Sequence, residues 1–114
     1  MRIWDIIFFP PSGESHSPYN KFLNWPDKRE RAQVVHRLET LRELEIGYWP
    51  QTWIHKITGK IFQLSANKCR VMFCLDGKKI VVLHICKKVS QKTRRGDVNR
   101  AETHYNEYML QKKG

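Results

Sequence analysis

The residues best suited to chemistry are lysines and arginines that follow the most hydrophobic part of the chain. Six of the fourteen residues from Lys87 to Arg100 are basic and one is acidic. A buried hairpin strand that ends in Lys87-Lys88 delivers these cations to one end of a sheet. Basic side chains at this density neutralise phosphates and release counterions, so the segment predicts a polyanion as binding partner.

The charge of the whole chain favours the same partner. The 114 residues include 21 Lys and Arg against 11 Asp and Glu, for a formal net charge of +10. On one small domain such an excess favours RNA or DNA, with solubility alone as the competing explanation. No stretch has the pattern of an interfacial helix, and no apolar run approaches the roughly 20 residues that span a bilayer. A membrane partner is therefore not expected.

The cysteines predict the cellular compartment. All three, Cys69, Cys74 and Cys86, fall in predicted strands. Their odd number and the lack of a Cys-x-x-Cys pair argue against a disulfide framework and against a zinc site. We expect small core residues in a cytoplasmic protein that needs neither metal nor cofactor.

Hydrophobic periodicity and turn residues predict the elements that position the cations. The expected order is a strand over residues 3–9, a short helix over 19–25, a long helix from a cap at Asp27 to Gly47, three antiparallel strands over 60–65, 71–75 and 78–86, and a final helix capped by Thr93 or Asp97. This order predicts an α+β two-layer fold, β-α-α-β-β-β-α with a largely antiparallel sheet, in a single domain over residues 1–114.

The central hairpin has the most specific local signal. Asp76-Gly77 between two β-rich segments predicts a two-residue type I′ turn. Such a turn pairs Leu75 with Lys78, Phe73 with Ile80, Val71 with Val82 and Cys69 with His84. Arg70 then lies on the other face of the hairpin, beside Met72, in a more apolar setting than a solvated arginine prefers.

Two helical stripes are expected to cover the sheet. Val34, Leu38 and Leu41 lie at helical spacing in the long helix, and the final helix has a second stripe at Val98, Ala101, Tyr105 and Tyr108. His55 and His104 have no partner that the sequence defines and are expected on the surface. Trp49 and Trp53 are either base-stacking surfaces or, more simply, core residues.

Several short motifs together resemble the RelE/HigB (phage-derived) toxin family of type II toxin–antitoxin systems. The motifs are Gly13-Glu14 with Pro18, Glu45-Ile46-Gly47, Arg70-Val71-Met72, Asp76-Gly77, Leu83-His84, Lys87-Lys88 and Gln91-Lys92-Thr93. The similarity covers nearly the whole chain and implies a RelE-like fold. Three positions depart from the family pattern, with Ser65 and Val89 where basic residues are usual and Arg94 where a proline is usual.

The resemblance implies a toxin that cleaves mRNA in the ribosomal A site without a metal ion. Its partners would be mRNA on the ribosome and a cognate helix-turn-helix antitoxin. Cleavage by the 2′-hydroxyl requires a base, an acid for the leaving oxygen and cations around the phosphate. The acidic residues concentrate in helices, so a two-metal site is disfavoured.

The site residues follow from that chemistry. Arg70 is the predicted clamp on the scissile phosphate, with Lys88 and Lys92 stabilising charge. Contacts to the RNA backbone are assigned to Lys68, Lys87, Arg94 and Arg95. His84 and Tyr105 are either catalytic or structural, as a satisfied core histidine and as part of the packing stripe.

Two other functions remain open. The first is a non-catalytic protein on the RelE/ParE scaffold, either a decayed toxin or a gyrase inhibitor, which Ser65 and Val89 keep in consideration. The second is a phage protein that binds nucleic acid in assembly or regulation.

Overall fold

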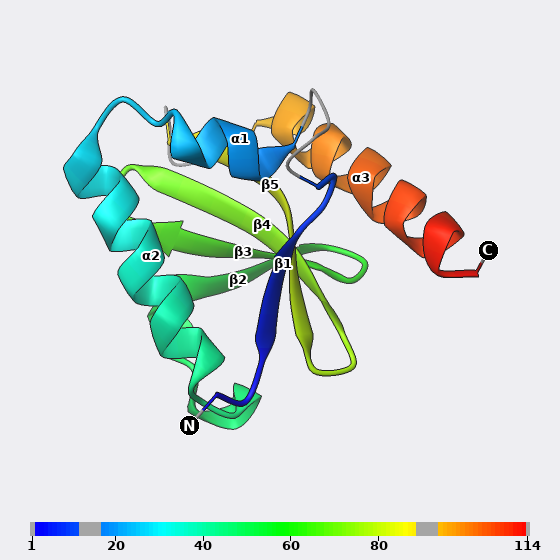
Figure 1. Ribbon diagram of the computed structural model, residues 1–114, viewed down its shortest axis with the longest axis horizontal. Coiled ribbons are helices and arrows are strands. Elements are labelled where there is room, and N and C mark those ends of the chain that lie inside the picture. Colours follow the sequence, from blue (N-terminus) through cyan, green and yellow to red (C-terminus); the bar gives the residue numbers. More distant parts are fainter. Residues whose placement is uncertain (1, 12–16, 89–93, 114) are drawn as a thin grey trace.

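The protein folds around one twisted sheet flanked by helices (Figure 1). The computed structural model describes residues 2–11, 17–88 and 94–113. The elements are β1 (Asp5–Phe8), α1 (Pro18–Leu23), α2 (Lys28–Arg42), two 3-10 turns, η1 (Ile46–Tyr48) and η2 (Gln51–Trp53), then β2 (Ile54–Thr58), β3 (Ile61–Ala66), β4 (Cys69–Asp76), β5 (Lys79–Lys87) and α3 (Arg95–Lys113). The predicted α+β class with a largely antiparallel sheet is confirmed, and the architecture is compatible with the RelE-like fold.

The sheet has five strands in the order β1-β5-β4-β3-β2. Strands β2 to β5 are antiparallel neighbours, while β1 lies at the edge and is parallel to β5. The sequence predicts four strands and none over residues 54–58. They form β2 instead, since Gly59 at φ +50° closes a tight turn that returns the chain along β3.

The predicted register of the central hairpin is wrong. Asp76 pairs with Lys79, so the turn consists of Gly77 and Lys78. Gly77 has a φ of +60°, and Lys78 is not among the positive-φ residues. Glycine at the first central position is the type II′ pattern, which spares the lysine a left-handed conformation that a type I′ turn would demand. Asp76 thus ends β4, where it accepts hydrogen bonds from α3.

A β-bulge in β5 decides which face its last residues occupy. Phe73 pairs with Val82 and Met72 pairs with His84, so Leu83 is an extra residue without a partner in the ladder. The carbonyl of Leu83 accepts a hydrogen bond from His104 Nδ1 at 2.7 Å. His104 is 4% exposed, so the prediction of a surface position is wrong.

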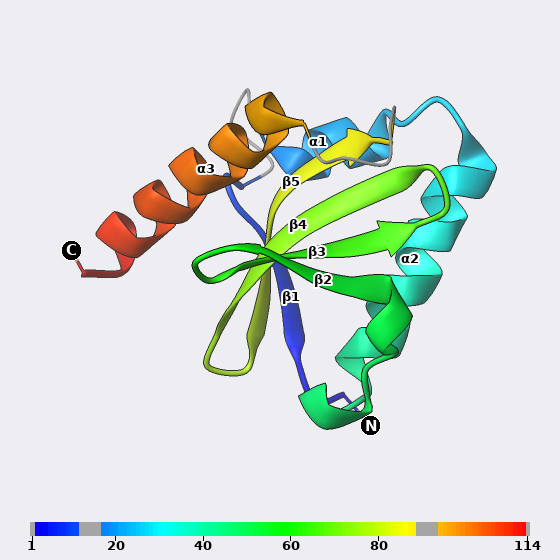
Figure 2. The same cartoon turned by 180° about the vertical axis from the view of Figure 1, so that it is seen from behind.

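The two helical stripes pack on opposite faces of the sheet (Figure 2). On one face Val34, Leu38 and Leu41 of α2 join a cluster around Phe73. On the other, Ala101, Tyr105 and Tyr108 of α3 pack with residues such as Met72, Val81 and Leu83. Both predicted stripes are confirmed, as is the burial of Cys69, Cys74 and Cys86. Among the described helices, none has the length and apolar character needed to cross a membrane.

The C-terminal end of α2 differs from the prediction, because tertiary contacts bind a backbone carbonyl that a longer helix would use. Asp27 caps α2 as expected and accepts from the backbone of Arg29 at 2.9 Å. The helix stops at Arg42 instead of continuing to Gly47. The carbonyl of Leu44 accepts hydrogen bonds from the indoles of Trp4 and Trp49, which hold the chain in a non-helical path. Thr93, one of the two proposed caps of the last helix, lies outside the described residues.

Candidate active site

A cleft of about 790 Å³ opens at the end of the sheet where β5 stops. Its walls come from α1, from the end of β5 and from the first turns of α3. Three cations, Lys21, Arg94 and Arg100, line it together with His84 and Asp97. A concave site that combines a histidine, a carboxylate and several cations is suited to binding and transforming a phosphorylated ligand.

His84 and Asp97 form a hydrogen-bonded pair in this cleft. His84 Nε2 lies 2.9 Å from Asp97 Oδ1, with the side chains 12% and 22% exposed. Burial lowers the pKa of His84, while the hydrogen bond to Asp97 opposes that shift. An ionised carboxylate only accepts, so Nε2 carries the proton that it donates to Asp97. In the neutral ring Nδ1 is then the acceptor, the form that a general base requires.

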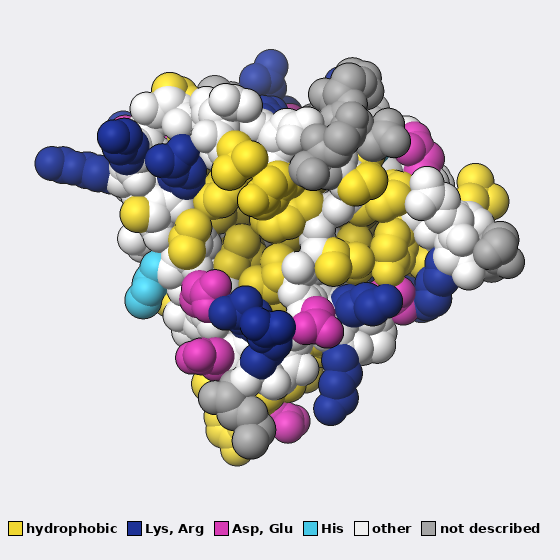
Figure 3. Space-filling model, in the orientation of Figure 1, with side chains coloured by type: hydrophobic (Ala, Val, Ile, Leu, Met, Phe, Trp, Pro, Cys, Tyr) yellow, Lys and Arg dark blue, Asp and Glu magenta, His cyan; other side chains and the backbone are white. Residues whose placement is uncertain are grey.

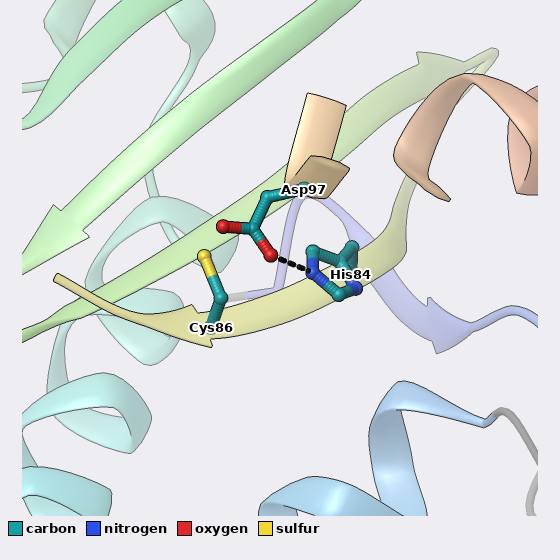
Figure 4. A group of neighbouring side chains, drawn as sticks. All are labelled: His84, Cys86 and Asp97. Carbon is teal, nitrogen blue, oxygen red and sulfur yellow. Dashed lines mark hydrogen bonds and ion pairs between the residues drawn. The ribbon is translucent and has the colours of Figure 1, made fainter. Parts of the chain in front are cut away.

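Cys86 completes a group of three neighbouring side chains (Figure 4). It is 5% exposed. Its sulfur, a ring nitrogen of His84 and a carboxylate oxygen of Asp97 all lie within 4.8 Å of one another. Burial, together with the charge and the hydrogen bond of Asp97, raises the pKa of Cys86 to about 12. The residue is therefore a thiol in the metal-free protein, and these three could hold a metal ion.

Arg70, the predicted phosphate clamp, lies under the surface. Its exposed fraction is 4%, and it pairs in the sheet with Ser65 on one side and Cys86 on the other. It lies on the α3 face with Met72, as predicted. Its positive charge acts on the Cys86 thiol and favours the thiolate. Arg70 thus contributes a fixed charge from beneath the site and is not among the cleft-lining residues.

Three predicted lysines surround the same end of the sheet. The backbone N–H of Lys88 donates to the carbonyl of Lys68 at 2.6 Å, which joins the end of β5 to the β3–β4 turn. The Lys87 ammonium lies 3.9 Å from the carboxylate of Glu30, a buried residue that also accepts from Trp25 Nε1 at 2.9 Å. All three lysine side chains are exposed.

The remaining predicted residues separate into two groups. Arg94 and Arg95 are exposed at the start of α3, and Arg94 lines the cleft. Tyr105 packs in the α3 cluster and does not line the cleft. Lys92 lies outside the described residues, as does Val89.

We call the basic residues at this end of the molecule the cationic end. It consists of seven exposed side chains, namely Lys21, Lys68, Lys87, Lys88, Arg94, Arg95 and Arg100. They come from α1, the β3–β4 turn, the end of β5 and the start of α3. The grouping follows from the topology, since β3, β4 and β5 all place one terminus at this end.

The two tryptophans considered for base stacking have structural partners. Trp49 is 7% exposed and donates its indole N–H to the carbonyls of Leu41 and Leu44 at 3.0 Å. The guanidinium of Arg37 stacks over Trp53, 4.5 Å from the ring centroid. Both contacts favour the packing interpretation over base stacking.

Sequence reasoning missed part of the cleft. Asp97 was considered only as a helix cap, and Lys21 and Arg100 were not assigned to any site. Lys21 is more than sixty residues from His84 in the chain, and no local pattern links α1 to β5. The one available signal was Asp97 itself, the single acid in a strongly basic segment.

A second surface feature is an apolar groove between β1, α1 and α2. Figure 3 shows hydrophobic side chains gathered in the hollowed centre of this face. The groove measures about 240 Å³, and Ile6, Phe8, Phe22, Val35 and Leu38 are among its lining residues. Val35 is 42% exposed. Exposed apolar surface of this kind favours contact with another protein.

Comparison with models of protein families matches residues 21–106 to the family described as phage derived protein Gp49-like (DUF891). The matched segment contains strands β2 to β5 and most of the cleft-lining residues, from Lys21 in α1 to Arg100 in α3. A search of curated proteins finds no match to the chain.

Proposed function

The chain belongs to the Gp49-like family of phage derived proteins, and from this membership and the cleft we propose that it is the toxin of a type II toxin–antitoxin system. In this proposal it is a ribosome-dependent endoribonuclease that cleaves mRNA without a metal ion. The observation that carries the proposal is the His84–Asp97 pair in a cleft lined by Lys21, Arg94 and Arg100.

The pair supports the first half of the reaction. His84 Nδ1 takes the proton of a ribose 2′-hydroxyl, while Asp97 holds the ring in the required tautomer and stabilises the cation that forms. The 2′-oxygen then bonds to the adjacent phosphorus and the bond from phosphorus to the 5′-oxygen breaks. A proton from an acid completes the leaving group, so the products are a 2′,3′-cyclic phosphate and a 5′-hydroxyl.

The cations support the second half. Negative charge grows on the phosphate oxygens in the transition state, and the cations that line the cleft stabilise that charge. Arg100 and Arg94 line the cleft, and we assign Lys88 to the leaving-group side as charge stabiliser or acid. Arg70 contributes its charge from below, through the neighbourhood of Cys86. Lys92 keeps its proposed role on sequence grounds alone.

The proposed partners are mRNA in the ribosomal A site and a cognate helix-turn-helix antitoxin. The cationic end supports the first, because phosphate neutralisation provides affinity without sequence preference. The apolar groove between β1 and α2 supports the second, as a surface that a small protein could cover.

Primer extension on mRNA in a reconstituted translation mixture tests the proposal. Wild type should produce new 5′ ends only when ribosomes are present. His84→Gln and Asp97→Asn should each weaken them by roughly 10²-fold or more, the usual contribution of a general base. Lys88→Ala should also lose activity, whereas Lys60→Ala, at the opposite end of the sheet, serves as the matched control and should not.

The outcomes separate this function from its alternative. Cleavage that His84→Gln and Asp97→Asn leave intact would remove the pair from the mechanism. Absence of cleavage by folded wild type would favour a non-catalytic protein, for which Ser65 opposite Arg70 is the supporting sequence feature. Inhibited DNA replication without mRNA cleavage would then identify the gyrase-inhibitor form of that alternative.

A further inference from the structure

We propose that His84, Cys86 and Asp97 form a binding site for a thiophilic divalent transition metal ion, with Zn²⁺ as the best match. The three side chains come from β5 and from the first turn of α3. Their potential ligand atoms lie within 4.8 Å of one another, and they point toward a common centre (Figure 4). Neither the family match nor the proposed nuclease chemistry assigns a metal here.

The separations fit a tetrahedral zinc site after a small closure. Zinc lies about 2.3 Å from sulfur and about 2.0–2.2 Å from nitrogen or oxygen, so neighbouring ligand atoms are separated by about 3.3–3.8 Å. The His84 nitrogen and the Asp97 oxygen are 2.9 Å apart and would separate slightly as the ion replaces the shared proton. If the sulfur is 4.8 Å from another ligand atom, the largest separation in the group, it would have to approach by about 1 Å. A rotation of the Cys86 side chain could provide that movement.

The donor set selects the kind of ion. A thiolate with an imidazole suits zinc and related ions, whereas magnesium and calcium prefer oxygen ligands. Three protein ligands leave the fourth position open, and His84 and Asp97 line the cleft from which water or a small ligand could enter.

Charge balance permits the ion in a basic neighbourhood. Binding releases the thiol proton of Cys86, so a thiolate, a carboxylate and a neutral imidazole surround an ion of charge +2. The complete site is neutral. Lys21, Arg70 and Arg100 all lie close enough to act on its residues. Binding thus changes the charge of the site by +1, from the single carboxylate of the apo protein to a neutral complex. The charges of Lys21 and Arg70 assist this step, because they favour loss of the Cys86 thiol proton.

One consequence rests on the proposed function. An ion bound by His84 Nε2 and Asp97 replaces the hydrogen bond that holds the catalytic tautomer. The Zn²⁺-loaded protein would then be an inactive form, in which coordination would replace the hydrogen bond between His84 of β5 and Asp97 of α3. Binding itself does not depend on that function.

Cobalt spectroscopy of the folded, metal-free full-length protein provides the test. Titration with Co²⁺ should give one equivalent of a tetrahedral complex with a thiolate-to-cobalt charge-transfer band in the near ultraviolet, and Zn²⁺ should displace it. Cys86→Ala should lose the band. Cys69→Ala is the matched control, because Cys69 is also buried but lies on the opposite face of the sheet, and it should keep the band.

A second variant protects the test against misfolding of the first. Asp97→Asn changes a partly exposed side chain and should weaken Co²⁺ binding by about 10²-fold. Loss of a residue that only orients a ligand costs about 10–100-fold in metal affinity, and loss of a ligand itself should cost at least as much. The proposal fails if folded wild type gives no charge-transfer band at millimolar Co²⁺, or if the band survives in Cys86→Ala. Exposed histidines cannot mimic the signal, since the band requires sulfur. None of these readouts uses RNA, so failure here and failure of the nuclease proposal are separate results.

Discussion

The cationic end allows a quantitative prediction about RNA binding. Each phosphate contact on a single strand contributes about 0.7 to the slope of log K against log salt. If all seven exposed cations contact phosphates, wild type should have a slope near −5. A rise from about 50 to about 200 mM salt would then weaken binding by roughly 10³-fold.

The perturbation is the double variant Lys68→Met/Lys88→Met. Both side chains are exposed, and they lie side by side because the Lys88 N–H donates to the Lys68 carbonyl. Lys87 is left in place, because its removal would leave the buried Glu30 carboxylate without its cation. Losing two contacts should reduce the slope by about 1.4, so the same rise in salt should cost only about 10²-fold.

The control is the double variant Lys60→Met/Lys78→Met, which has the same net charge as Lys68→Met/Lys88→Met. These lysines occupy the turns at the opposite end of the sheet. Strand β4 has eight residues, so the two ends are separated by about 23 Å. That distance is more than twice the Debye length of about 10 Å at 0.1 M salt. The control should therefore keep the wild-type slope.

Fluorescence anisotropy with a 2′-O-methyl RNA oligonucleotide, which cannot be cleaved through its 2′-oxygen, measures affinity at several salt concentrations. Circular dichroism confirms that both double variants are folded. Equal slopes for the two double variants would refute the reasoning, because binding would then depend on net charge and not on the cationic end.

The other predictions concern stability. Tyr108→Phe should lower the free energy of unfolding by about 1–2 kcal/mol in chemical denaturation, since it deletes the 2.5 Å hydrogen bond to Asp76. Hydrogen bonds from Lys112 and Tyr108 lower the pKa of Asp76, so the stability advantage of wild type over Asp76→Asn should be complete above about pH 4 and disappear as pH falls through the folded pKa; a constant difference down to pH 2 would contradict this. Gly77→Ala should cost about 1–2 kcal/mol because φ is +60° there. His104→Ala should cost about 1–3 kcal/mol by leaving a buried carbonyl unsatisfied, and NMR should report a changed environment for the bulge.

Local patterns were sufficient for much of the fold. The α2 stripe at Val34, Leu38 and Leu41 repeats at helical spacing, and the stripe is buried as predicted. Asp27 caps that helix because a short acceptor before a helical run satisfies its first N–H groups. Such signals lie within a few residues of one another, so tertiary structure has little opportunity to override them.

The errors occurred at positions that are contacted by groups distant in the sequence. The end of α2 depends on Trp4 and Trp49, which bind the Leu44 carbonyl from outside the helix. The register of the central hairpin places Asp76 at the end of β4, where its carboxylate accepts hydrogen bonds from Tyr108 and Lys112 of α3. Neither contact has a sequence signature, because each partner is at least five residues away and usually more than thirty.

The candidate site was predictable in composition but not in assembly. Basic side chains at the end of β5 follow directly from the run after Lys87. The pairing of His84 with Asp97 does not, because a strand residue and a helix residue meet only when the sheet and α3 are docked. A uniform alternation of side chains along β5 also predicts the wrong face for both His84 and Cys86.

The bulge at Leu83 is therefore the feature on which the site depends. With strict alternation from Val82, the side chains of His84 and Cys86 would point with it toward α2. One extra residue reverses that order, so His84 and Cys86 face α3 and meet Asp97. The carbonyl that the bulge removes from the ladder is bound by His104, two helical turns beyond Asp97 on the same helix. Docking of α3 thus stabilises the irregular strand and supplies the carboxylate in the same step. Both the proposed RNA cleavage and the proposed metal binding therefore require an intact α3.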